Sequence, residues 1–227
     1  MSRRRPRRLE PQTPIVSGLH RELAARYRFA VRYAAGHDVL DLGCGDGAGA
    51  ARLAGPAARV VGLDPVPSLV QRATRRYRRQ NLRFAVGGPS VRPLAPQSFG
   101  LITAFHRLDR VTDWPNFLDA ARLVLRPLGH LLLAVANAAW RPSGVLPEQF
   151  PSDDPALNLW ELHDLLADRF LVERLYGQSS TTRALLTHTT AYVGDSPGRL
   201  DLADRAAAVA GPANESSRFF VAVCRAG

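Results

Sequence analysis

The sequence predicts an α/β protein whose sheet is doubly wound and mostly parallel, and three observations carry this prediction. Short apolar segments of strand length alternate with segments of helical periodicity, which is the order that parallel strands joined by crossover helices produce. A turn with three glycines joins the first apolar segment, residues 39–42, to a segment of small residues. The next apolar segment ends in an acid, Asp64, about 20 residues after the turn begins, a spacing typical of ligand-binding α/β folds.

The length and composition of the chain limit the classes of protein to which it can belong. A chain of 227 residues with 46% hydrophobic content is long enough for one domain with a complete core. We expect residues 1–14, with their arginines and three prolines, to be a disordered basic arm, and residues 15–227 to form a single domain. No apolar run approaches the roughly 18 residues of a membrane span, and no apolar signal core is present, so we expect a cytoplasmic protein. The two cysteines, Cys44 and Cys224, do not indicate a metal site or a disulfide framework.

The chain is strongly basic. The formal net charge is +10, and all 30 basic residues are arginines. Five arginines fall within the first eight residues, and five more lie in residues 72–79. Such clusters bind nucleic acid or anionic lipid, but a disordered tail and a solvated helix face have the same composition. The sequence leaves both interpretations open and contains no recognisable RNA-binding motif.

The first predicted elements are a helix over residues 19–35 and a strand over residues 39–42. Apolar residues recur every four positions in the helix, Tyr27 among them, and Gly36 provides a stop. The strand is apolar except for one acid, Asp41. Asp41 lies two residues before the first glycine of the turn that follows, which makes it a candidate functional residue.

The glycine turn follows directly, and residues 39–47 read VLDLGCGDG. A strand, a glycine turn and a helix in this order let a ligand approach the backbone at a helix N-terminus. Gly43, Gly45 and Ala48 fit the dinucleotide fingerprint, so a dinucleotide is one candidate ligand. Asp41 favours S-adenosylmethionine instead, because a carboxylate helps to hold a cationic amino acid moiety and repels a pyrophosphate. A glycine turn without a ligand is the remaining alternative.

Asp64 is the second candidate contact in this part of the chain. It ends the strand over residues 59–63 and is followed by Pro65. One carboxylate has two acceptor oxygens, and the two ribose hydroxyls present two donors, so an acid at this place can bind a ribose. A surface acid after a strand is the alternative.

The remaining chain continues the alternation of strands and helices. We expect strands at residues 82–86, 98–105, 130–136, 171–176 and 218–225, and helices at 48–54, 68–79, 116–125 and 158–170, with Ser68 capping the second of these helices. Residues 200–210 have helical composition. We expect residues 138–157 and 178–217 to be substrate-side loops, because loops at the carboxyl ends of strands set specificity on such scaffolds.

Two further segments complete a recognisable order of motifs. Arg26-Tyr27-Arg28-Phe29-Ala30 precedes the glycine turn, and residues 170–178 end in Tyr-Gly-Gln. With these segments the chain resembles the class I S-adenosylmethionine-dependent methyltransferases, in particular the bacterial methyltransferase-11-like subgroup with RY-x-FA and YGQ segments. The resemblance covers roughly residues 19–178 and the final strand. It implies a Rossmann-like, doubly wound, mostly parallel seven-stranded sheet whose final strand inserts antiparallel between the fifth and sixth strands.

The resemblance also implies a cofactor and its contacts. The cofactor is S-adenosylmethionine, with S-adenosylhomocysteine as the product. In the family the first helix lies over the cofactor, which makes Tyr27 a candidate contact, although an ordinary core aromatic is an equal alternative. The expected cofactor-binding residues are Tyr27, Asp41, Gly43, Cys44, Gly45, Asp64, Pro65, Gly88 and Phe105.

Three positions depart from the family pattern. Gly88 replaces the acid that hydrogen-bonds the adenine amine, Gly100 replaces an acid in the fourth strand, and Arg110 replaces a histidine that is often the general base. An arginine cannot accept a proton at neutral pH. His106, just past the end of the predicted strand, is therefore the first candidate base, with Asp109 as the weaker one. A lone histidine of this kind is more often structural.

The sequence thus predicts an enzyme that moves a methyl group from S-adenosylmethionine to a small polar acceptor, such as an oxygen of a sugar, glycan or natural product. N-methyl transfer stays open. A catalytically degenerate binding or scaffold protein of the same fold is the alternative, and an RNA methyltransferase is less favoured. The expected partner is a small-molecule or glycan acceptor, and the sequence predicts no particular oligomeric state.

Overall fold

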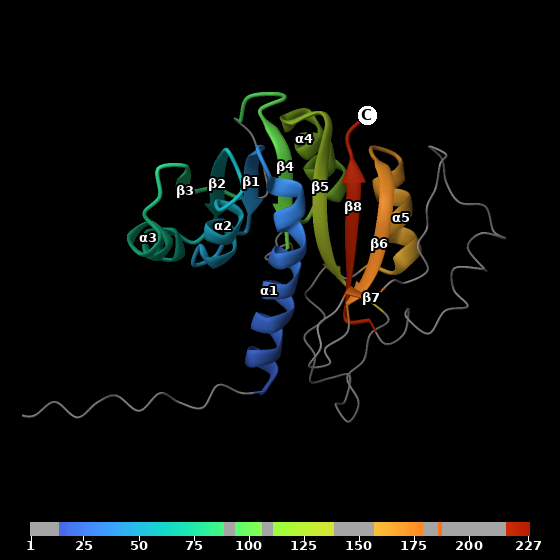
Figure 1. Ribbon diagram of the computed structural model, residues 1–227. Coiled ribbons are helices and arrows are strands. Elements are labelled where there is room, and N and C mark those ends of the chain that lie inside the picture. Colours follow the sequence, from blue (N-terminus) through green and yellow to red (C-terminus); the bar gives the residue numbers. More distant parts are fainter. Residues whose placement is uncertain (1–13, 89–93, 106–110, 139–156, 179–185, 188–216) are drawn as a thin grey trace, which may run out of the picture.

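The computed structural model describes residues 14–88, 94–105, 111–138, 157–178, 186–187 and 217–227 (Figure 1). Its elements in chain order are α1 (Pro14–Ala34), β1 (Asp38–Leu42), α2 (Ala48–Leu53), β2 (Arg59–Asp64), α3 (Pro67–Arg76), β3 (Leu82–Val86), β4 (Phe99–Ala104), α4 (Trp114–Val124), β5 (Leu125–Ala136), α5 (Leu159–Ala167), β6 (Leu171–Gln178), β7 (Leu186–Thr187) and β8 (Phe219–Arg225).

These strands form one sheet in the order β3-β2-β1-β4-β5-β8-β6-β7. The strands from β3 to β5 in this order pair in parallel, and β8 lies antiparallel between β5 and β6. The predicted doubly wound, mostly parallel α/β sheet with its inserted final strand is therefore confirmed. The two-residue β7, which pairs antiparallel with β6, is an eighth strand that the sequence did not indicate.

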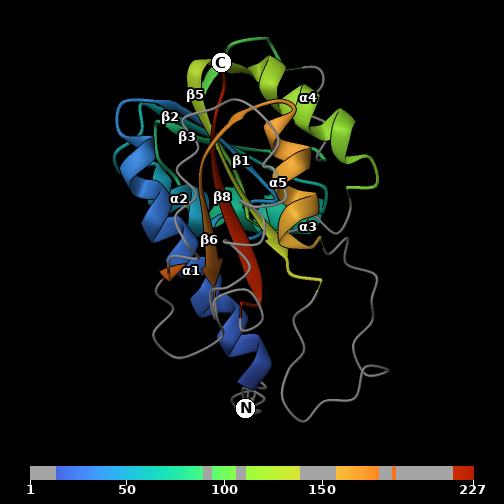
Figure 2. The same ribbon diagram turned by 90° about the vertical axis from the view of Figure 1, so that its right-hand side faces the viewer.

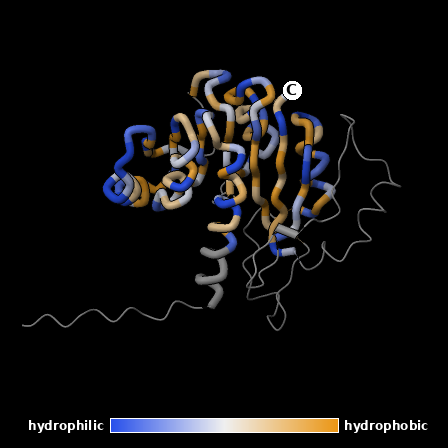
Figure 3. Tube along the Cα trace, in the orientation of Figure 1, coloured by the Kyte–Doolittle hydropathy of each residue, from blue (hydrophilic) through white to orange (hydrophobic). Residues whose placement is uncertain are grey.

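Helices cover both faces of the sheet, with α1 and α2 on one face and α4 and α5 on the other (Figures 1 and 2). Because successive strand residues point to opposite faces, β1 supplies Leu40 and Leu42 to the apolar cluster with α4 and α5, and Val39 to the cluster with α1 and α2. Figure 3 shows the resulting hydrophobic band along the central strands. Each fully buried leucine contributes about 1.5–3 kcal/mol, so these two clusters dominate the stability of the fold.

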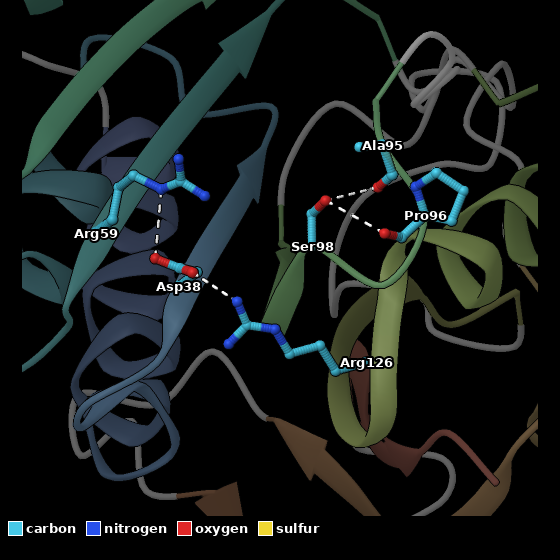
Figure 4. A network of polar contacts seen from close by, with 6 residues as sticks. All are labelled: Asp38, Arg59, Ala95, Pro96, Ser98 and Arg126. Carbon is cyan, nitrogen blue, oxygen red and sulfur yellow. Dashed lines mark hydrogen bonds and ion pairs between the residues drawn. The ribbon is translucent and has the colours of Figure 1, made fainter.

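The amino ends of the strands carry an exposed ionic network instead (Figure 4). Asp38, the first residue of β1, lies 3.3 Å from Arg59 Nε and 2.8 Å from Arg126 Nη2. Exposed ion pairs contribute at most about 1 kcal/mol each, so this network joins strand ends without dominating stability. Gly100, near the start of β4, lies at this same edge, where an added Cβ would come within 2.6 Å of His37 Nδ1. The absence of the family's acid at Gly100 is thus explained by packing against His37, at the edge of the sheet opposite the glycine turn.

Several predicted boundaries need correction. α1 begins at Pro14, five residues before the predicted start, and β5 begins at Leu125 rather than at residue 130. Ser68 does not cap α3, since the N-cap is Val66 and Pro67 occupies the first turn, where its missing N–H costs nothing. The expected arm up to residue 13, nearly all of the two expected loops and the helical segment at 200–210 lie outside the described residues.

Within the described ranges, no helix is both long and apolar enough to cross a membrane.

The start of α5 is fixed by a reciprocal cap. Asn158 Oδ1 accepts hydrogen bonds from the backbone N–H groups of Trp160 and Glu161, each at 2.9 Å, and Glu161 Oε2 accepts from Asn158 N at 2.8 Å. This capping box satisfies backbone donors that no preceding turn can reach. It explains why the helix starts at Leu159.

Replacing Asn158 by alanine should lower the free energy of unfolding by about 1 kcal/mol, because two backbone donors lose their acceptor. Urea denaturation followed by circular dichroism measures this change. Asn158→Asp keeps an acceptor at the same place and should retain most of the stability. An alanine variant as stable as the parent protein would contradict the role of the cap.

Candidate functional site

The glycine turn connects β1 to α2 through backbone conformations that favour glycine. Gly43, Gly45 and Gly47 have φ values of +72°, +58° and +85°. A Cβ at Gly47 would also lie 2.7 Å from Ala73 Cβ and from Phe84 Cζ, so packing excludes a side chain there. At Gly45 nothing lies within 4 Å of the Cβ position, so the outer side of the turn is open to a ligand.

Asp64 at the end of β2 fixes this turn. Its buried carboxylate accepts hydrogen bonds from Gly45 N at 3.0 Å and from Val66 N at 2.9 Å. The backbone N–H groups of Gly43 and Cys44 donate to Leu63 O at 2.8 and 3.0 Å. Asp64 therefore has a structural role in shaping the turn, and the ribose contact stays a prediction beside it.

Asp41 is a buried carboxylate next to the turn. It accepts hydrogen bonds from Thr103 Oγ1 at 2.7 Å and from the Tyr27 hydroxyl at 2.9 and 3.1 Å. In the described part of the chain, no cationic side chain bonds to it. Burial raises the pKa of Asp41 to about 7; the two hydroxyl donors lower it, and the charge of Asp64 raises it further. A cation bound over the turn would stabilise the ionised form.

Tyr27 joins α1 to this carboxylate. Its ring packs edge-on against Phe105, with centroids 5.3 Å apart, and lies so close to α2 that a Cβ at Gly49 would come within 2.0 Å of the ring. Burial and the charge of Asp41 hold the pKa of Tyr27 well above its usual value, so the hydroxyl keeps its proton. The side chain is only 4% exposed and orients Asp41, while direct contact with a cofactor stays a prediction.

The other predicted contacts gather at the same edge of the sheet. Cys44 is buried in the turn, Pro65 follows β2, Gly88 follows β3, and Phe105 follows β4. Because β3, β2, β1 and β4 are parallel neighbours, their carboxyl ends bring these residues together. Nothing lies within 4 Å of a Cβ at Gly88, so packing does not explain the missing acid there. The catalytic candidates His106 and Asp109 lie outside the described residues.

One set of contacts was not assigned from the sequence. Arg26 Nε donates to Gln178 Oε1 at 2.7 Å, and Arg26 Nη1 donates to the carbonyl oxygen of Phe105 at 2.9 Å. Gln178 Nε2 in turn donates to the carbonyl oxygen of Glu22 at 3.0 Å. The RY-x-FA and YGQ segments therefore meet in space. The spacing of Glu22, Arg26 and Ala30 by four, which places two charges on the apolar face of a helix, was the available signal.

The geometry fits S-adenosylmethionine, which the family implies as cofactor. An open glycine turn lies beside a buried carboxylate that has only hydroxyl partners among the described residues, and that cofactor brings a sulfonium and an ammonium group. The family model described as "Methyltransferase domain" matches residues 40–133, a span that starts in β1 and ends in β5 and contains the turn, Asp41 and Asp64.

Curated relatives agree with this assignment. A probable S-adenosylmethionine-dependent methyltransferase of Mycolicibacterium smegmatis is 33% identical over 140 residues, covering 62% of this chain and 54% of the relative. A demethylmenaquinone methyltransferase of Lactobacillus johnsonii is 30% identical over 165 residues, covering 69% and 62%. A ubiquinone biosynthesis O-methyltransferase of Methylocella silvestris is 31% identical over 124 residues, covering 54% and 46%. The chain spans about half the length of the curated relatives it matches.

Solved structures share the fold at low sequence identity. An S-adenosylmethionine-dependent methyltransferase from Mesorhizobium loti superposes with a TM-score of 0.64 at 16% identity, covering 89% of this chain and 99% of that one. A Haloferax volcanii methyltransferase complex with the activator Trm112 matches with a TM-score of 0.65 at 19% identity, covering 93% and 94%. Residues 40–133 of this chain are thus a methyltransferase domain by the family model, and the chain shares its fold and part of its sequence with class I S-adenosylmethionine-dependent methyltransferases.

Proposed function

We propose that the chain transfers a methyl group from S-adenosylmethionine to an oxygen of a small polar acceptor, such as a sugar, glycan or natural product. The observation that carries the proposal is Asp41, a buried carboxylate beside an open glycine turn that has only hydroxyl partners among the described residues. Relatives named as ubiquinone biosynthesis O-methyltransferases favour an oxygen as the methylated atom.

Each residue at this edge has a definable task in such a reaction. When bound, the cofactor supplies a methyl group already activated on a sulfonium, so the protein contributes mainly positioning. The N–H groups of the turn and the carboxylates of Asp41 and Asp64 would hold and orient this cofactor. Buried Phe105 would exclude water from it. His106, the residue after Phe105, would accept the proton of the acceptor hydroxyl at its imidazole nitrogen.

A second candidate is a non-catalytic binding or scaffold protein of the same fold. Gly88 favours it, because a side chain would fit at this position and none is present. An RNA methyltransferase has weaker support, which comes from the exposed arginines of α3, namely Arg72, Arg75 and Arg76. Gly100 supports neither alternative, because it packs against His37 at the opposite edge of the sheet.

Calorimetric titration with S-adenosylmethionine and S-adenosylhomocysteine should show that both bind. Asp64→Ala should weaken binding by about 1.5–3 kcal/mol, because a charged acceptor is lost and Gly45 N loses its partner. Asp46→Ala, which removes a half-exposed carboxylate from the same turn, is the matched control and should leave the affinity unchanged. Folded protein that binds neither compound would overturn the proposed function.

The pKa of Asp41 predicts a pH-dependent affinity for S-adenosylmethionine. Because a cation stabilises the ionised carboxylate, affinity should rise with pH through about 7 and level off above it, with proton release on binding. Calorimetry in buffers of different ionisation enthalpy measures the released protons near pH 6.5.

Asp41→Asn is the control for this effect, because the amide keeps the shape of the side chain and cannot ionise. The variant should bind more weakly at pH 8 and show no proton release. If the parent protein and Asp41→Asn released the same number of protons, the protons would come from a group other than Asp41.

A further inference from the structure

We infer that Glu22 and Arg26 of α1 form an acceptor subsite that binds two neighbouring hydroxyl groups of an uncharged ligand. The inference rests on the proposed methyl transfer, whose acceptor class it narrows. It starts from a cluster of buried polar atoms that have no part in the predicted cofactor contacts.

The cluster lies at the carboxyl edge of the sheet, beyond the strands next to the cofactor site. Arg26 donates to the carbonyl oxygen of Phe105 after β4 and to Gln178 at the end of β6, and its guanidinium stacks 4.1 Å from the ring centroid of Phe219 at the start of β8. Figure 1 shows α1 extending past this edge of the sheet. Ligands of open parallel sheets bind outside the carboxyl ends of the strands, so the cluster is placed for an acceptor.

Three polar atoms in this cluster are buried and accept or donate no hydrogen bond within the described residues. Glu22 and Arg26 are 2% and 1% exposed, yet Glu22 Oε1, Glu22 Oε2 and Arg26 Nη2 make no hydrogen bond. These are three of the four such side-chain atoms in the described part of the chain. Arg218 Nη1 lies 3.6 Å from Glu22 Oε1, which is an ion-pair distance but too long for a hydrogen bond. Buried charged groups without hydrogen bonds are costly, so a fold that keeps three of these atoms together points to a missing ligand.

The three atoms without hydrogen bonds determine which chemical group a ligand must present. Guanidinium nitrogens only donate hydrogen bonds, and carboxylate oxygens only accept them. A hydroxyl group does both, so two adjacent hydroxyls can donate to Glu22 and accept from Arg26 Nη2. A carboxylate or phosphate would be repelled by Glu22, and an ammonium group by Arg26 and Arg218.

Burial disfavours the charged form of each residue, and the opposite charge of the other residue opposes this effect. Burial lowers the pKa of Arg26 to about 10, which leaves the guanidinium protonated, and nearby Glu22 opposes that shift. Burial raises the pKa of Glu22, and Arg218 and Arg26 oppose it. A vicinal diol is therefore the matching group, and both sugars and aromatic diols present one.

The test is ligand-observed NMR and calorimetry on the chain saturated with S-adenosylhomocysteine, with methyl α-D-mannopyranoside and catechol as probes. Benzoate and cyclohexylamine serve as charged controls. We expect one diol to bind, and its identity distinguishes a sugar from an aromatic acceptor. Glu22→Gln should weaken that binding about tenfold or more, because one acceptor oxygen becomes an NH2 donor and the other loses its charge, while S-adenosylhomocysteine binds as before.

The control variant is Glu173→Gln, the same substitution near the start of β6, where Glu173 pairs with Arg225 and His130. It should leave diol binding unchanged. Glu22→Gln also removes the ion pair with Arg218, so its melting temperature is measured beside that of the parent; if it does not fold, Glu22→Asp, which keeps the charge, takes its place.

The inference is overturned if neither diol binds the loaded chain, if benzoate or cyclohexylamine binds more tightly, or if Glu22→Gln only lowers the melting temperature. Failure of S-adenosylhomocysteine to bind would instead overturn the proposed function. In that case the probes are titrated against the unloaded chain, where a loss of diol binding on Glu22→Gln would still support the subsite.

Discussion

A single buried carboxylate joins three elements of this fold. Asp41 lies in β1, and its two hydrogen-bond donors come from Tyr27 in α1 and Thr103 in β4. Because water is excluded around it, the carboxylate can remain in an apolar sheet only while both hydroxyls reach it. The position of α1 across the sheet follows from this requirement, and so does the close approach of α1 to α2, which Gly49 permits by lacking a side chain. The proposed cofactor site lies directly beside this arrangement.

The two edges of the sheet differ in the environment of their carboxylates. At the amino edge, Asp38 forms exposed ion pairs that solvent screens and that leave no buried group unsatisfied. At the carboxyl edge, Asp41, Asp64 and Glu22 are buried carboxylates, and two of them have raised pKa values. Such groups lower the stability of the folded chain, and proteins keep them where a ligand or a reaction uses the charge.

The sequence predicted seven of the eight strands, because hydrophobic periodicity and glycine turns are local signals, and the family resemblance supplied the place of the final strand between the fifth and sixth. The contacts of Arg26 could not be predicted in this way, since Gln178 lies 152 residues further along the chain and only the topology brings the two together. The prediction that Ser68 caps α3 was wrong, because Pro67 at the first helical position sets the start of the helix instead. The two-residue β7 was missed because so short a strand has no periodicity.

The contact between Arg26 and Gln178 also constrains the order in which the chain can fold. α1 leaves the ribosome early, but its buried guanidinium has no acceptor at Gln178 until β6 has been synthesised. Tyr27 can reach Asp41 before then, and Arg26 can reach the carbonyl oxygen of Phe105, but the Nε of its buried guanidinium gains an acceptor only with β6. A nascent chain that stops before β6 would therefore keep α1 with an incomplete set of buried polar contacts, which the last third of the chain completes.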